Sequence, residues 1–232
     1  MRRATTVRMP SNFSVKKAHM AQLKLSERVV RKNVLPGKIC CVAGVDVAYI
    51  EGSSIGAVAV LDYESLSLKE SQTAICKTLF PYIPTLLSYR EVPPIVSAIK
   101  RLKVKPDILL VDGQGIMHPY RCGFASHLGL IIRKPTIGVA KSRLCGEVQT
   151  STKEWAPIVD NKEMIGAAVT TKKGRNPIYV SIGNMISLKT AIAIVKHCAR
   201  AYAIPEPTRQ AHIIATLEKR KMQNTPSCKG SD

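Results

Sequence analysis

The stretch from residue 105 to residue 130, KPDILLVDGQGIMHPYRCGFASHLGL, constrains the fold more than any other part of the chain. Its apolar run, Ile108 to Val111, ends directly in Asp112-Gly113-Gln114-Gly115. A continuous apolar run bounded by turn residues is typical of a strand that is buried on both faces. An acid at the carboxyl end of such a strand lies where open α/β sheets bind their ligands, and glycines let the backbone approach a ligand closely. We therefore predict a central strand that carries a functional carboxylate, although a strand end with a polar turn gives the same pattern.

The segments before this stretch predict hairpin strands and two helices. Apolar periodicity predicts a helix over residues 15–32, strands over residues 39–49, 55–63 and 66–79, and a helix over residues 86–101. Pro93-Pro94 is expected to interrupt that second helix or to start a new one.

The segments after the stretch alternate between helices and strands. They predict a helix over residues 126–132, a strand over 135–140, a strand pair over 165–171 and 177–182, a helix over 187–203 with Ser187 as its N-cap, and a last helix over 209–219. Residues 151–161, with the one tryptophan of the chain, are expected to form a surface segment. This order favours a single α/β domain, a mixed central sheet flanked by helices on both faces, as in the RNase H-like fold.

The two ends of the chain are polar and basic. We expect a disordered N-terminus over residues 1–14, one folded catalytic domain over residues 15–219, and a basic tail over residues 220–232. Lys and Arg number 35 against 16 Asp and Glu, a net charge of +19, which favours nucleic acid as the partner. Part of that charge is equally compatible with solvated surface. No apolar stretch is long enough to span a bilayer, so we expect no membrane partner.

The chain contains seven cysteines, an odd number, and no CxxC pair. This pattern is typical of reduced cysteines in a cytoplasmic protein rather than of a disulfide framework or a zinc site. The basic N-terminus lacks the apolar core of a secretory signal.

Three acids, Asp46, Glu91 and Asp112, each interrupt an apolar or structured segment at a strand end or a helix break. Carboxylates that converge at the centre of a sheet bind Mg²⁺ or Mn²⁺, which activates water and stabilises the leaving oxygen in phosphodiester hydrolysis. On a basic protein such a centre favours a nuclease, because without a metal three carboxylates repel a phosphate. Each acid alone is equally compatible with a cap or a turn.

The segments that carry these residues resemble the endonuclease V family. They are GVDVAY at 44–49, PYIPTLLSYRE at 81–91, DGQGIMHPYRCGFASHLGL at 112–130, PTIGVAKSRLCG at 135–146, PIYVSIGN at 177–184 and IPEPTRQAH at 204–212. They follow the family's order, and the resemblance covers about residues 18–218. It implies an enzyme of DNA repair, expected to be a monomer, that recognises inosine, the deaminated form of adenine, in nucleic acid. It also implies hydrolysis of the second phosphodiester bond 3′ to the inosine, which leaves a 3′-OH and a 5′-phosphate.

The resemblance implies a catalytic role for five residues. Asp46, Glu91 and Asp112 would hold Mg²⁺, for which Mn²⁺ may substitute. Lys141 would lie near the scissile phosphate and offset its charge. His212, at a position where some members have Asp, would orient metal-bound water or support the metal ligands.

The resemblance also implies a wedge and a lesion pocket. The wedge would be Pro81-Tyr82-Ile83-Pro84, which separates the strands and fills the gap left by the flipped base. The pocket would use Thr85, Leu87, Gly113, His118, Gly123 and Leu144. Thr85 departs from a glycine seen in some members, so the loop must tolerate a side chain there. Without the resemblance, Tyr82 is equally compatible with a packed loop aromatic.

Three alternatives remain at this point. The enzyme could be an inosine-specific ribonuclease, because no short motif announces or excludes contacts to the 2′-OH of RNA. It could be a structure-specific nuclease of RNase H-like fold that cleaves branched DNA lacking inosine. A non-catalytic nucleic-acid-binding module is disfavoured, since a pure binder gains nothing from three carboxylates facing phosphate.

Overall fold

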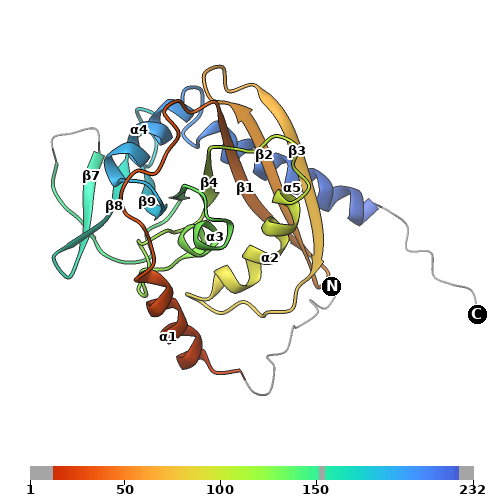
Figure 1. The fold of residues 1–232 in the computed structure, drawn as a ribbon, viewed down its shortest axis with the longest axis horizontal. Coiled ribbons are helices and arrows are strands. Elements are labelled where there is room, and N and C mark those ends of the chain that lie inside the picture. Colours follow the sequence, from red (N-terminus) through yellow and green to blue (C-terminus); the bar gives the residue numbers. More distant parts are fainter. Residues whose placement is uncertain (1–12, 152–154, 225–232) are drawn as a thin grey trace, which may run out of the picture.

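A nine-stranded mixed sheet forms the centre of the computed structural model, which describes residues 13–151 and 155–224 (Figure 1). The strand order across the sheet is β3-β2-β1-β4-β5-β9-β8-β7-β6. The strands are β1 (Cys41–Ile50), β2 (Ser53–Asp62), β3 (Leu68–Lys77), β4 (Ile108–Asp112), β5 (Thr136–Ala140), β6 (Glu147–Val148), β7 (Trp155–Asp160), β8 (Glu163–Val169) and β9 (Ile178–Asn184). Strands β1, β4 and β5 run parallel, and the remaining neighbours pair antiparallel.

Strand β4 is the buried centre of this sheet, as predicted. Ile108 and Leu110 lie in the core cluster that α4 (Leu188–Cys198) and α5 (Glu206–Asn224) complete on one face. Leu109 and Val111 lie in the cluster that α2 (Leu87–Ile99) and α3 (Phe124–Ile132) complete on the other face. Because successive side chains of a strand point to opposite faces, a strand covered by helices on both sides needs an unbroken apolar run. The fold is therefore the predicted single α/β domain with a mixed sheet flanked by helices.

Helix α2 continues through Pro93-Pro94, so the predicted interruption is wrong. The two rings remove the amide hydrogens that would bond to the carbonyls one turn earlier. Packing outweighs this loss, since Pro94 and its neighbour Ile95 are buried against the sheet. A Cβ atom on Gly56 of β2 would lie only 2.5 Å from the Pro94 carbonyl carbon, so helix and strand are in direct backbone contact there.

The segment around Trp155 is also different from the prediction. It forms strand β7, which pairs with β8, and its Ile158 is fully buried. Alternation across this strand is weak, because only one of its six side chains is buried. The short strand β6, which pairs with β7, was not predicted either.

Several boundaries shift. Helix α1 covers Val15–Ser26 and ends before residue 32, whereas α4 ends at Cys198 rather than at residue 203. Ser187 caps α4 as predicted, since its hydroxyl accepts a hydrogen bond from the Thr190 amide at 3.3 Å. Helix α5 begins at Glu206 and reaches Asn224, so the first five residues of the predicted tail, 220–224, are helical.

Residues 1–12 and 225–232, which carry most of the predicted terminal segments, lie outside the described residues. In the described ranges, no helix has both the length and the apolarity needed to cross a bilayer.

Candidate active site

Two of the three predicted acids lie side by side on neighbouring parallel strands. Val45 of β1 pairs with Val111 of β4, so the next residue along each strand is Asp46 and Asp112. Glu91 approaches from α2, where it is 7% exposed. The pKa of Glu91 is raised to about 8, chiefly by burial and in addition by the charges of Asp46 and Asp112, against a hydrogen bond that lowers it. The three carboxyl groups therefore lie within electrostatic reach of one another.

Each of these carboxyl groups also has a polar partner. The Tyr49 hydroxyl donates to Glu91 Oε1 at 3.0 Å, Lys141 Nζ donates to Asp112 Oδ2 at 3.0 Å, and His212 Nδ1 lies 2.8 Å from Asp46 Oδ2. Burial raises the pKa of Asp112, and the Lys141 ammonium partly offsets this. We call Asp46, Glu91 and Asp112 the acidic group. The predicted Lys141 contacts its Asp112, and the predicted His212 contacts its Asp46.

The acidic group fits a divalent cation. Negatively charged carboxylates that lie close together repel one another, and this repulsion raises their pKa values. A bound cation offsets the repulsion. Among the described residues, no three Asp, Glu, His or Cys side chains are drawn together tightly enough to form a finished metal cage. Asp46 and Asp112 instead contact His212 and Lys141 in this structure. The chemistry of the donor set, hard oxygens from β1, β4 and α2, suits a hard divalent cation.

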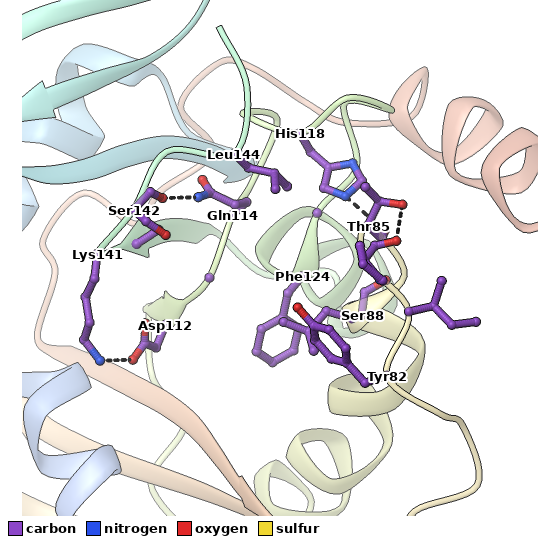
Figure 2. A pocket seen from close by; sticks show the side chains of 16 residues that line it. Tyr82, Thr85, Ser88, Asp112, Gln114, His118, Phe124, Lys141, Ser142 and Leu144 are labelled. Atoms are coloured by element: carbon purple, nitrogen blue, oxygen red, sulfur yellow. Dashed lines mark hydrogen bonds and ion pairs between the residues drawn. The ribbon is translucent and has the colours of Figure 1, made fainter. Parts of the chain in front are cut away.

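A pocket of about 370 Å³ opens beside Asp112 and Lys141 (Figure 2). This volume falls in the range of sites that hold a small organic ligand. All six residues predicted for the lesion pocket line it, together with three of the four predicted wedge residues: Thr85, Leu87, Gly113, His118, Gly123 and Leu144, with Tyr82, Ile83 and Pro84. Of the residues predicted for the wedge and the lesion pocket, Pro81 is the one that does not line this pocket.

Thr85 forms one wall of the pocket with an unusual backbone. Its φ of +71° lies in the left-handed region, which a β-branched residue rarely adopts. The Thr85 carbonyl accepts hydrogen bonds from Gln22 Nε2 at 2.8 Å and from His118 Nε2 at 3.0 Å. The Thr85 hydroxyl lies 2.9 Å from His19 Nε2. Helix α1 and the His118 loop therefore hold the wall in the conformation that a glycine would adopt freely.

The protonation of His118 follows from its contacts. The Tyr120 amide donates to His118 Nδ1 at 3.2 Å, so Nε2 carries the hydrogen that is donated to the Thr85 carbonyl. Burial lowers the pKa of His118 to about 4, and the ring is neutral at physiological pH.

The amides of the pocket glycines form hydrogen bonds within the protein. The Gly113 amide donates to the Val139 carbonyl, and the Gly123 amide donates to the Gly115 carbonyl, both at 3.0 Å. A Cβ atom on Gly123 would lie 2.4 Å from the Gln114 carbonyl oxygen. These amides are therefore occupied and not free to read a base.

The N-terminus of α3 supplies a free donor instead. Its N-cap, Gly123, offers no side-chain hydrogen bond, and within the described residues nothing accepts a hydrogen bond from the amide of Phe124, which lines the pocket. An uncapped helix N-terminus favours an acceptor atom or a negative charge.

Several pocket residues escaped the sequence analysis. They are Ser88, Gln114, Phe124, Ala140 and Ser142, each within four positions of a predicted residue. Gln114 Nε2 donates to the Ser142 carbonyl at 2.8 Å, and the Ser88 hydroxyl lies 3.0 Å from His127 Nδ1. Each of them is adjacent in sequence to a residue that was predicted for the site, and this proximity could have identified them.

Comparisons with known proteins agree with one another. Residues 23–213 match the family described as Endonuclease V. The chain is 45% identical to the Endonuclease V of Thermofilum pendens, over 92% of each chain, and 45% identical to that of Rippkaea orientalis, over 88% of this chain and 90% of the other.

Solved structures of the same name share the fold. The Endonuclease V of Streptomyces avermitilis superposes with a TM-score of 0.83 at 34% identity, over 94% of this chain and all of the other. The catalytic domain of human Endonuclease V gives 0.85 at 26% identity, over 94% of this chain and all of the other. The Ciona intestinalis Endonuclease V, solved in complex with a 24mer DNA containing an inosine followed by a ribo-adenosine, gives 0.82 at 30% identity, over 90% of this chain and 98% of the other.

Proposed function

The chain belongs to the Endonuclease V family and is a nuclease, and from this premise we propose that it recognises inosine in nucleic acid and nicks the strand beside it. The observation that carries the proposal is the sharing of Asp112 and Lys141 between a base-sized pocket and the acidic group. A nucleotide whose base enters the pocket brings its own backbone to the carboxylates. The Ciona intestinalis relative was solved with inosine-containing DNA, which supports the same ligand here.

Inosine fits the polar groups of the pocket better than adenine does. Its base, hypoxanthine, presents an O6 acceptor, where adenine presents an amino donor. The free amide of Phe124 at the start of α3 can donate to such an acceptor and repels an amino group. A base must leave the stack to be read in this way, and the pocket supports base flipping for that reason.

The acids supply the cation site in this proposal. Asp46, Asp112 and Glu91 would hold Mg²⁺, or Mn²⁺ in its place, and such an ion would supply an activated water and stabilise the leaving oxygen. Lys141 Nζ, at the edge of the pocket, offsets the charge of the phosphate. His212, fixed through Nδ1 on Asp46, presents its other ring nitrogen as a proton acceptor for the attacking water.

The bond that we propose for cleavage is the second phosphodiester 3′ to the inosine, with a 3′-OH and a 5′-phosphate as products, in DNA repair. One experiment tests the whole proposal. Matched DNA and RNA strands with a single inosine, and the same strands with adenine, are incubated with the full chain and Mg²⁺, and the product ends are mapped. Cleavage of inosine DNA alone supports the proposal. Cleavage of RNA alone supports the ribonuclease, and equal cleavage of the adenine strands contradicts inosine recognition.

A structure-specific nuclease on the same fold is the second candidate. It predicts cleavage of branched DNA that lacks inosine. A branched substrate without inosine in the same experiment separates the two, because the pocket has no role in that reaction.

A further inference from the structure

A second hollow borders the acidic group at Asp46, whereas the base pocket borders it at Asp112. Its volume is about 520 Å³, and β1 and α5 form its walls. Asp46 and Tyr49 line it from the strand, and His212, Lys219, Arg220 and Gln223 line it from the helix. We call this hollow the α5 groove. Positions 212, 216, 219 and 223 recur every three or four residues, so they share one face of α5.

The groove carries positive charge at the end away from the carboxylates. Arg220 is exposed and Lys219 is half-buried, and in the described residues neither forms an ion pair or a hydrogen bond. Several other cations among the described residues do have acidic partners. Lys221, the next residue of α5, contacts Glu218 at 3.2 Å and does not line the groove. Two unpaired cations in a hollow of a protein with a net charge of +19 fit an anionic ligand.

The position of the groove identifies which part of a substrate it would hold. Asp112 and Lys141 border the base pocket, whereas Asp46 and His212 border the groove. The two aspartates follow directly after the paired residues Val45 and Val111, so a strand that crosses them passes from one hollow into the other.

We propose that the α5 groove binds the sugar–phosphate backbone of the nucleotides on the 3′ side of the cleaved bond. This rests on the proposed function, in which the base pocket holds the inosine and the cut falls 3′ to it. Lys219 and Arg220 contact backbone phosphates without reading sequence. From His212 to Gln223 the helix rises about 16 Å, and at about 3.4 Å per stacked nucleotide this spans roughly five nucleotides.

The test measures affinity against strand length. Labelled inosine strands with 3′ arms shorter and longer than that span are titrated with the full chain in EDTA, by fluorescence anisotropy, at several salt concentrations. A second set varies the 5′ arm alone. The variants are Lys219→Gln and Arg220→Gln, each alone and together. Lys221→Gln removes one charge from the same helix outside the groove and is the matched control for the single variants.

The double variant should bind the long 3′ arm on the order of tenfold less tightly than the wild type, with a salt dependence reduced by about two in log–log slope. With the short 3′ arm it should match the wild type, and Lys221→Gln should match it on both. An equal loss on short and long 3′ arms, no loss at all, or a loss that follows the 5′ arm would overturn the proposal. Equal binding and cleavage of inosine and adenine strands would instead reject the proposed function, whatever the arms show.

Discussion

Thr85 joins a β-branched side chain to a left-handed backbone, at a φ of +71°. Such a conformation costs about 1–3 kcal/mol for a residue other than glycine. Helix α1 and His118 compensate with hydrogen bonds to its carbonyl, and His19 adds one to its hydroxyl. The threonine at this position, where some family members have glycine, therefore strains the backbone at the pocket wall.

Two substitutions separate the strain from the hydrogen bonds. Thr85→Val keeps the branched side chain and removes the hydroxyl, so we expect a loss of about 1–2 kcal/mol in the free energy of unfolding. Thr85→Gly removes the hydroxyl but also the strain, and should stay within about 1 kcal/mol of the wild type. Urea unfolding measures both. If Thr85→Gly is destabilised as much as Thr85→Val, the backbone is not strained.

His118 predicts a dependence of stability on pH. Burial lowers its pKa from 6.5 in the unfolded chain to about 4 in the folded protein. Between these values the unfolded chain binds a proton that the folded protein does not, so this contribution to stability is fully present above pH 6.5 and is lost as the pH falls to about 4. The slope from this residue is at most about 1.4 kcal/mol per pH unit.

The variant His118→Gln should lose that share of the slope. Urea unfolding at intervals from pH 7.5 to pH 4 compares the variant with the wild type. The two curves should approach each other as the pH falls, even though the variant is less stable at neutral pH through the lost bond to Thr85. Parallel curves would show that His118 titrates normally in the folded protein.

Single residues also show how far the sequence could be read. Asp112 was predictable because it ends an apolar run, and strand register then brings Asp46 beside it. Gln22 was not, because its role depends on a contact between α1 and Thr85, 63 positions along the chain. Tyr49 was missed for the same reason, since only the fold brings its hydroxyl to Glu91.

At the scale of elements, strand β4 and the cap of α4 followed from local patterns, whereas the continuity of helix α2 and the existence of strand β7 did not. Pro93-Pro94 is tolerated in α2 because the helix packs directly on β2, and no local rule includes that contact. Strand β7 has one buried side chain, so its pairing with β8, rather than its pattern, makes it a strand.

The segment before α2 carries the proposed wedge. Tyr82 is 68% exposed at the rim of the base pocket, in a loop whose backbone is restricted at Pro81 and Pro84. Tyr82→Ala should weaken binding of inosine duplex by about 1–3 kcal/mol through the lost stacking surface. The loss should be smaller on single strands, where less stacking has to be broken. Gel-shift titrations on both substrates measure this.

A nearby residue offers the control for the wedge. Leu79 is 73% exposed, lies three positions earlier and does not line the pocket, so Leu79→Ala should leave both affinities unchanged. Equal losses on duplex and single strand for Tyr82→Ala would argue against a strand-separating role.

At the scale of the whole molecule, the acidic group borders both the base pocket and the α5 groove. Asp112 and Lys141 border the first hollow, and Asp46 borders the second. These acids carry negative charge, whereas the chain as a whole has a net charge of +19. The acids border both hollows, but the contacts proposed for the base and for the phosphates come from other residues, so cleavage should be removable without loss of binding.

Asp46→Asn and Asp112→Asn test this division. Each keeps the shape of the side chain and removes a negative charge from a site for a hard cation. We expect nicking of an inosine duplex in Mg²⁺ to fall about 100-fold or more, because direct ligands matter at least as much as the groups that support them. Affinity measured without a divalent cation should persist or tighten, since less negative charge then faces the phosphates.

The matched control is Glu64→Gln, an exposed acid outside both hollows, which should change neither measurement. Near-normal nicking by either Asn variant would remove that acid from the cation site. Loss of inosine binding together with nicking would show that the pocket depends on the acids, and that recognition and cleavage are not separable in this fold.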